Sequence, residues 1–208
     1  EIKNPLTPIQ LSAERIIKNL QKNGKDMNKV IKEGANTIVQ EAGTIKSLVD
    51  EFSSFARLPS VKPQPANIHE LIEHTISLFE GIFSDIEFET QFFPEMPSPI
   101  QLDPEQMKRV FINLFDNAID AMNKKGKIRV ETSFDKQHQS VRIEIADTGP
   151  GISLEDKEKL FLPHFSTKSK GSGLGLAIVN QVINEHDGSI DVENNKPFGA
   201  KFIITIPA

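Results

Sequence analysis

The sequence predicts an α+β protein in which a helical hairpin precedes an α/β sandwich. Three observations lead to this prediction. Residues 1–58 carry apolar side chains at heptad spacing, residues 59–66 hold three prolines, and residues 67–208 combine helical periodicity with strand-like alternation. We therefore expect a hairpin at 1–58, a stiff linker at 59–66, and a domain at 67–208 whose helices cover one face of a mixed sheet.

Composition excludes several classes of function. The 208 residues carry a formal net charge of −5, which argues against a nucleic-acid partner. The chain contains no cysteine, so disulfides, cysteine-ligated zinc and thiol catalysis are excluded. No apolar run approaches the roughly 18 residues of a membrane span. We expect this piece to be cytoplasmic, with membrane contact only through segments upstream of it.

The hairpin prediction depends on two apolar seams separated by the glycine turn "QKNGKD". The first seam comprises Leu6, Ile9, Ala13, Ile16 and Leu20. The second comprises Ile31, Ala35, Ile38, Ala42, Ile45, Val49, Phe52 and Ala56, and Gly34 and Gly43 interrupt it at about 1 kcal/mol each. Two helices bury such seams poorly, so we expect a homodimer that forms a four-helix bundle. The alternative is a two-helix stalk packed on the rest of the chain.

The second half alternates helices and strands. Asp103 as N-cap and Pro104 at the first helical position predict the start of a long helix. The predicted helices are 68–81, 103–122 and 174–186. The predicted strands are 86–93, 127–134, 140–147, 188–194 and 200–207. Residues 149–173, rich in glycine, serine and lysine, are expected to form a loop.

The stretch "NLFDNA" holds the first candidate site residues. Asn113 and Asn117 are four residues apart and share one helix face. Their amide oxygens can help to hold Mg²⁺, which prefers oxygen ligands and keeps part of its shell for water and phosphates. The alternative is a pair of solvated surface asparagines.

The stretch "IADTGPGI" holds the second set. Asp147 ends a predicted strand, and its carboxylate can accept a hydrogen bond from the amino group of adenine. Gly149 and Gly151 allow backbone to approach a base closely. The alternative is an ordinary Asp-Gly turn.

The stretch "KGSGLGLAIV" holds the third set. Gly171, Gly173 and Gly175 lead into a helix whose N-terminal N–H groups can cradle phosphates. Leu176 breaks the dinucleotide fingerprint and the P-loop pattern is absent, so an ATP site here is neither of the Rossmann nor of the Walker type. The alternative is a flexible loop before a helix.

The stretch "LFLPHFSTKSK" lies between the second and third sets. Phe161 and Phe165 can hold a lid over the site by packing. Lys168 and Lys170 can reach the β- and γ-phosphates. His164 is interpreted as a surface or lid residue and not as a catalyst.

Taken together, "NLFDNA", "DTGPG", "LFLPHF" and "GSGLGL" resemble, in order and spacing, the N, G1, F and G2 boxes of sensor histidine kinases of two-component systems. The opening "EIKNPLTP" resembles the acceptor-helix motif of that family, and within the family the chain looks most like the NtrY-type nitrogen-regulation sensors. The resemblance implies the sandwich fold shared with Hsp90 and gyrase, with ATP or ADP and Mg²⁺ as cofactors. The nucleotide-contacting positions that it implies are Asn113, Asn117, Asp147, Gly149, Gly151, Lys168, Gly171, Gly173, Leu174, Gly175 and Leu176, with Asn117 and Asn113 as metal ligands.

The resemblance also implies a reaction. In this family the phosphorylated histidine stands directly before the glutamate that corresponds to Glu1, and Glu1 is our candidate base for it. Asn4 matches the position that orients water when family members dephosphorylate their partner, and Pro5 matches a helix-kinking proline. The implied partners are a second copy of the chain and the receiver domain of a response regulator. The parent protein is expected to be anchored in the plasma membrane.

Some positions depart from the family pattern. Asp120 replaces a common lysine, "EHDGS" replaces His-Gly-Gly, and "PFGAKF" lacks one glycine of the last box. Hydrolysing relatives such as gyrase, Hsp90 and mismatch-repair ATPases carry Glu where this chain has Asn113, and an amide cannot accept a proton. ATP hydrolysis as the main activity is therefore disfavoured, and a catalytically silent dimeric scaffold is the other alternative.

Overall fold

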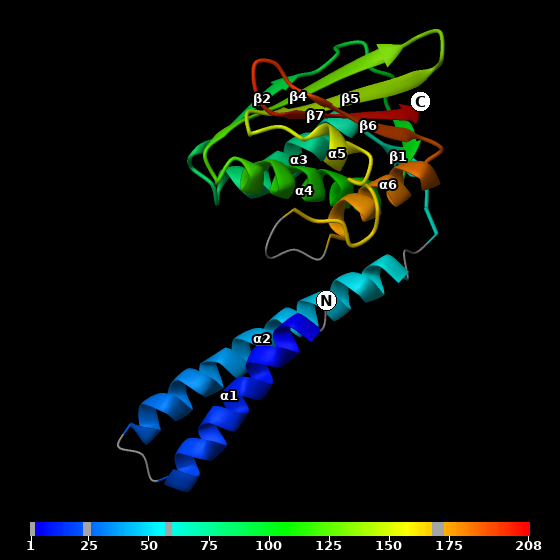
Figure 1. Ribbon diagram of the computed structural model, residues 1–208. Helices are drawn as coiled ribbons and strands as arrows, with labels where there is room; N and C mark the ends of the chain where they lie inside the picture. The colour runs from blue at the N-terminus through cyan, green and yellow to red at the C-terminus, as the bar shows by residue number, and fades with distance from the viewer. Residues whose placement is uncertain (1–2, 23–25, 57–59, 168–172) are drawn as a thin grey trace. The chain divides into compact units, whose positions relative to one another are not determined.

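The computed structural model describes residues 3–22, 26–56, 60–167 and 173–208. The chain divides into two compact units, Glu1–Leu58 and Pro59–Ala208. The first unit is a pair of helices and the second is a sheet with helices on one face (Figure 1). Within the described ranges, no helix is both long and apolar enough to cross a bilayer.

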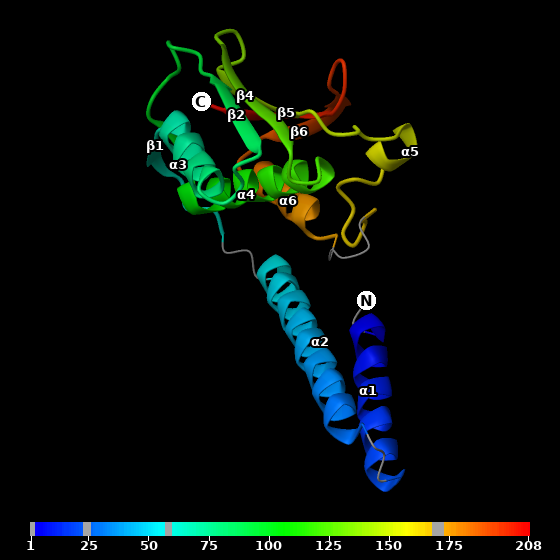
Figure 2. The same ribbon diagram turned by 90° about the vertical axis from the view of Figure 1, so that its left-hand side faces the viewer.

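Helices α1 (Lys3–Lys22) and α2 (Met27–Ala56) lie side by side as a hairpin (Figures 1 and 2). Helix α2 runs through both of its glycines without a break. A Cβ atom at Gly34 would lie only 2.7 Å from Ile16 Cδ1, whereas one at Gly43 would meet open space. Gly34 therefore lets the two helices approach closely, and only Gly43 lacks a packing reason in the single chain.

The predicted apolar seams are only partly covered within one hairpin. Leu6 is 47% exposed, Leu20 48% and Val49 46%. Val30, which the heptad count left out, is buried. Further apolar side chains of the hairpin reach solvent, and these are Leu11, Ile17 and Val39. One hairpin alone thus leaves several large apolar side chains exposed, which is unusual for the surface of a monomeric protein.

The second unit is built on a five-stranded sheet of order β2-β4-β5-β7-β6. Strands β2 and β4 are parallel and the other neighbours are antiparallel. The strands are β2 (Ile86–Gln91), β4 (Gly126–Asp135), β5 (Ser140–Asp147), β6 (Ser189–Asn194) and β7 (Ala200–Pro207). Helices α3 (Ile68–Glu80), α4 (Pro104–Ala121) and α6 (Gly175–Glu185) cover one face of the sheet (Figures 1 and 2). The predicted α+β class and the mixed sheet are confirmed.

The core lies between that helical layer and the sheet. Phe115 on α4 makes edge-to-face contacts with Phe79 of α3 and Phe88 of β2, at ring-centroid distances of 5.7 and 5.4 Å. Ile128 and Val130 of β4 are fully buried beneath them. Such aromatic packing contributes more than the buried area alone and fixes α4 on the sheet.

Asp103 connects three segments at the start of α4. Its Oδ1 atom accepts the backbone N–H groups of Glu105 and Gln106, as the N-cap prediction requires. Its Oδ2 atom accepts the backbone N–H of Lys62 at 3.0 Å, and its own N–H donates to Nε2 of His186 at 2.9 Å. Partial burial raises the pKa of Asp103, but the three backbone N–H donors outweigh it and the pKa is lowered.

Three short elements differ from the sequence prediction. Strand β1 (Gln64–Ala66) falls inside the expected linker and pairs antiparallel with β3 (Ile100–Leu102), which was not predicted. Helix α5 (Leu154–Lys157), capped by Ser153, interrupts the expected loop. Elements of three or four residues carry too few positions for a periodic signal, so periodicity could not find them.

Candidate nucleotide-binding site

Asp147 lies at the carboxyl end of β5 and is 5% exposed. Its Oδ1 atom accepts the backbone N–H of Gly149 at 2.8 Å and that of Ala200 at 3.1 Å. Among the described residues both donors meet Oδ1, so Oδ2 is the oxygen left for an outside donor. A buried carboxylate held in one orientation is well suited to read a single amino group on a ligand.

Burial raises the pKa of Asp147, and the N–H groups of Ala200 and Gly149 offset this only in part. A carboxylate kept out of water gains from any donor that reaches its remaining oxygen. Raised carboxyl pKa values of this kind often mark functional positions.

Asn113 and Asn117 lie one turn apart on α4, as predicted, and both are half-buried. Nδ2 of Asn113 donates to the carbonyl oxygen of Arg109 at 2.8 Å. The carbonyl side of that amide faces the first residue of α6, because a Cβ atom at Gly175 would lie 2.8 Å from Asn113 Oδ1. The structure thus brings the first and third predicted sets together where α4 meets α6.

Gly173 and Leu174 lead into α6. Gly173 has a φ of +63°, and a Cβ atom there would lie 2.6 Å from the backbone carbon of His164. His164 N–H donates to the Gly173 carbonyl oxygen at 3.0 Å, which ties the "LFLPHF" stretch to the glycine loop. Leu174 is buried and Leu176 is half-buried.

Several predicted residues are not tested by this geometry. Glu1, Lys168 and Gly171 lie outside the described residues. Asn4 is exposed on α1, in the other unit. Phe161 and Phe165 are half-buried, whereas His164 is exposed, as expected for a lid or surface histidine.

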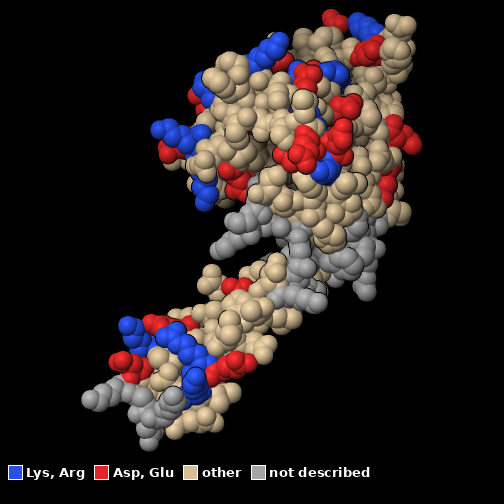
Figure 3. All heavy atoms as spheres, in the orientation of Figure 1, with Lys and Arg blue, Asp and Glu red and all other residues tan. Residues whose placement is uncertain are grey.

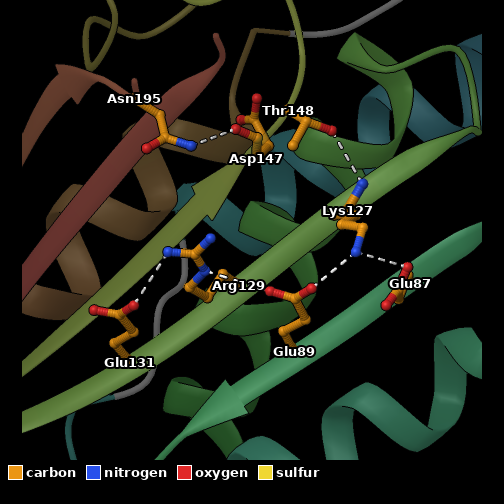
Figure 4. A network of polar contacts seen from close by, with 8 residues as sticks. All are labelled: Glu87, Glu89, Lys127, Arg129, Glu131, Asp147, Thr148 and Asn195. Carbon is orange, nitrogen blue, oxygen red and sulfur yellow. Dashed lines mark hydrogen bonds and ion pairs between the residues drawn. The ribbon is translucent and has the colours of Figure 1, made fainter. Parts of the chain in front are cut away.

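The turn between β6 and β7 contributes residues that sequence reasoning missed. Gly199 has a φ of +105°, and a Cβ atom there would overlap the carbonyl oxygen of Asp147. Asn195 Nδ2 donates to that same carbonyl oxygen at 3.0 Å (Figure 4). Gly151 has a φ of +79°, and a Cβ atom placed there would lie 3.0 Å from the Gly199 carbonyl oxygen. The sequence signal for Gly199 is the final glycine box of the family, "PFGAKF", which has one glycine fewer than usual in this chain.

On the open face of the sheet, charged side chains pair across the strands near Asp147 (Figure 4). Lys127 contacts Glu87 and Glu89 at 3.0 and 2.9 Å, and Arg129 contacts Glu89 at 3.4 Å. Both signs alternate over the visible surface of this unit (Figure 3). Exposed pairs of this kind add little stability to the fold.

These donors fit a nucleotide with Mg²⁺. Asn113 and Asn117 carry amide oxygens, Asp147 carries a carboxylate, and α6 begins with backbone N–H groups at Gly175, where a Cβ atom would lie 2.8 Å from Asn113 Oδ1. The described residues contain no cluster of three acidic or histidine side chains for a metal ion. A metal bound here would therefore depend on phosphate oxygens to complete its shell.

Residues 102–208 match the model of the histidine kinase-, DNA gyrase B- and HSP90-like ATPase family. The chain belongs to this family. The match covers α4, the end of β5 and α6, which are the elements that carry the site.

Relatives of this chain include sensor kinases that match nearly all of its length. It is 34% identical to nitrogen regulation protein NtrY of Azorhizobium caulinodans over 96% of this chain and 26% of the relative. It is 32% identical to the signal transduction histidine-protein kinase AtoS of Escherichia coli over 100% of this chain and 33% of the relative. The chain thus spans about a quarter to a third of these curated relatives.

Among solved structures, histidine kinase ThkA in complex with response regulator protein TrrA superposes with a TM-score of 0.76 at 32% identity. The match covers 100% of this chain and 58% of that one. The predicted resemblance to sensor histidine kinases and the predicted ATP-binding fold are confirmed by these comparisons.

Proposed function

We propose that this chain is the catalytic portion of a sensor histidine kinase that uses ATP to phosphorylate a histidine directly before Glu1. The phosphoryl group then passes to an aspartate in the receiver domain of a response regulator. In this proposal residues 1–58 form the dimerisation and phosphoacceptor hairpin and residues 67–208 form the catalytic domain. The similarity to NtrY and AtoS and to the ThkA complex supports the assignment.

The observation that carries the proposal is that α4 meets both other stretches: Asn113 Oδ1 faces Gly175, and a Cβ atom at Gly149 would lie 3.5 Å from the Cβ atom of Ala121. Asp147 presents Oδ2 at the end of β5, and the amide oxygen of Asn113 faces Gly175 at the start of α6. A base reader, an oxygen ligand and a phosphate cradle are the parts that an ATP site needs. Mg²⁺, when bound, neutralises charge that develops on the phosphates during transfer.

Each residue has a defined task in this scheme. Asp147 accepts the adenine amino group, and Asn117 with Asn113 supplies amide oxygens to the metal. The N–H groups at the start of α6 donate hydrogen bonds to phosphate oxygens, with Lys168 as a cationic partner. When the imidazole nitrogen forms its bond to the γ-phosphorus, the bond to the ADP oxygen breaks and Glu1 accepts the ring proton. Asn4 orients the water that hydrolyses the phosphate from the partner when the chain acts as a phosphatase of the response regulator.

Asn113 also argues against hydrolysis as the main activity. Its Nδ2 donates to the Arg109 carbonyl oxygen, which leaves the amide oxygen toward the site. An amide oxygen accepts a hydrogen bond but does not take up a proton at neutral pH. It therefore cannot act as the general base that a water nucleophile requires.

The homodimer follows from the hairpin. The half-exposed Leu6, Leu20 and Val49 belong to the heptad seams, and a second copy of the hairpin would cover such a stripe in a four-helix bundle. Light scattering at tens of micromolar, an order of magnitude suited to contacts of moderate affinity, should give a dimer mass. A monomer at that concentration would contradict this part of the proposal.

The test of catalysis uses a longer chain in which a histidine precedes Glu1 within native upstream helix. Radiolabelled ATP should give an acid-labile phosphate on that chain, and the label should move to the receiver domain when it is added. Glu1→Gln should slow labelling while ATP affinity stays nearly unchanged, because it removes a proton acceptor and not a binding contact. ATP binding without any labelling would favour the silent scaffold, and rapid phosphate release without labelling would favour hydrolysis.

A further inference from the structure

The turn that joins β6 to β7 holds the loop after β5 at two points. Asn195 Nδ2 donates to the backbone carbonyl oxygen of Asp147 at 3.0 Å, and Asn195 N–H closes the turn by donating to the Gly199 carbonyl oxygen at 2.8 Å (Figure 4). The next residue after that glycine, Ala200, donates its N–H to Asp147 Oδ1 at 3.1 Å. Backbone and carboxylate of Asp147 are therefore fixed by the same turn.

Asn194 holds the other end of the loop. Its Oδ1 atom accepts the backbone N–H of Ile152 at 2.9 Å, and its Nδ2 donates to the Ile152 carbonyl oxygen at 3.1 Å. This pair of bonds imitates a neighbouring strand, because one side chain satisfies both backbone groups of a single residue. A Cβ atom at Gly151 would lie 3.1 Å from Asn194 Oδ1, so the contact is close and leaves the loop little room.

A third contact holds the loop from the opposite side. Thr148 Oγ1 accepts the N–H of Lys127 at 3.0 Å (Figure 4). The same hydroxyl donates to Met122 Sδ at 3.3 Å. Asp147 thus lies between a threonine tied to β4 and α4 and an asparagine tied to the β6–β7 turn. These contacts hold the backbone and Oδ1 of Asp147, and they therefore limit how far its carboxylate can turn toward a ligand.

We propose that Asn195 and Asn194 are positioning residues that set the base selectivity of the nucleotide site by fixing Asp147 and the loop that follows it. This inference rests on the proposed function of Asp147 as the reader of the adenine amino group. Hydrogen-bond selection depends steeply on angle and distance. A carboxylate that is free to shift still binds a nucleotide but loses its preference for a base with an amino group at that position.

The test compares the affinities of three nucleotides: ATP, purine riboside triphosphate, which lacks the amino group, and GTP. Asn195→Asp keeps the shape of the side chain but sets an oxygen against the Asp147 carbonyl oxygen, and Asn195→Ala and Asn194→Ala remove the contacts without adding charge. Asn184→Asp is the matched control, since the Asn184 side chain is exposed on α6 and its side-chain contact among the described residues is a 3.4 Å bond to Asn180. All affinities are measured by calorimetry in the same Mg²⁺ buffer.

We expect the preference for ATP over purine riboside triphosphate to fall about threefold to tenfold in the Asn195 variants, the range that one displaced hydrogen bond gives. The Asn194 variant should fall less, and the control should be unchanged. A merely structural role, or the added charge of Asn195→Asp, would weaken both nucleotides equally and leave the ratio as it was.

Asp147→Asn separates the two levels of the proposal. If it abolishes the preference while the Asn195 variants retain it in full, the positioning role is wrong and the base reader stands. If Asp147→Asn itself leaves the preference intact, the base reader is wrong and the positioning role falls with it. Asn195→Ala replaces Asn195→Asp in the comparison if the charged variant does not fold.

Discussion

Asp147→Asn should separate ATP binding from folding stability. The variant amide keeps Oδ1 for the N–H groups of Gly149 and Ala200, so the local structure is retained. It places an NH₂ group where Oδ2 stood, and that group faces the amino group of adenine. A hydrogen bond to a charged acceptor contributes about 1.5–3 kcal/mol, which corresponds to about a tenfold to hundredfold loss of ATP affinity.

Stability should respond in the opposite direction. Burial raises the pKa of Asp147, so its protonated form favours the folded state. That contribution is fully present below the unfolded-state pKa and is lost as pH rises through the folded-state pKa. At pH 7 the ionised side chain therefore works against folding, and the neutral amide relieves this. At pH 7 and without nucleotide, the free energy of unfolding of Asp147→Asn should equal or exceed that of the parent chain. This difference should disappear in acid, where Asp147 is protonated in the parent.

The assay combines calorimetric titration with Mg²⁺-ATP and denaturant unfolding without nucleotide, both at pH 7. Asp191→Asn is the matched control, because this substitution makes the same chemical change at an exposed position of β6. An unchanged ATP affinity in Asp147→Asn would refute the base pocket. A loss of stability that accounts for the loss of binding would show that Asp147 serves the fold and not the ligand.

Three further perturbations test other parts of the structure. Asp103→Ala should lower the unfolding free energy by about 1–2 kcal/mol through loss of the helix cap. Because the pKa of Asp103 is lowered in the folded state, the stability difference between variant and parent should shrink in denaturation series as pH falls through that pKa. Gly199→Ala should abolish ATP binding in calorimetry because its Cβ atom would overlap the Asp147 carbonyl oxygen at a φ of +105°; tight binding by this variant would contradict the turn geometry. Gly43→Ala should stabilise α2 by about 1 kcal/mol, whereas Gly34→Ala should stabilise it less because Ile16 must move; equal effects by thermal unfolding would contradict the hairpin packing.

Sequence reasoning located the elements whose signal is local. Helix α4 could be predicted because Asp103, Pro104 and a long apolar periodicity all lie within one segment. Strands β4 and β5 could be predicted because alternation continues over 10 and 8 residues. The fold class followed from these strong signals and was confirmed.

Contacts between distant segments could not be predicted in the same way. Strand β1 lies in the segment whose three prolines predict a stiff linker, yet it pairs with β3, more than thirty residues further along the chain. The sequence alone predicts that Gly34 destabilises its helix, because the side chain that packs against it, Ile16, lies on the other helix. Asn195 carries no motif, and its contact with Asp147 joins positions 48 apart in the sequence. Tertiary packing decided all three.

Hydrogen exchange with and without Mg²⁺-ATP tests most directly the central claim, that the loop after β5 and the start of α6 belong to one ATP site. The account predicts slower exchange at the backbone N–H groups of Gly149, Gly151 and 173–178 together. The hairpin at 133–140, at the far end of β4 and β5, should be unchanged and serves as the internal reference. Protection confined to one of the two stretches, or spread equally over the reference hairpin, would contradict it.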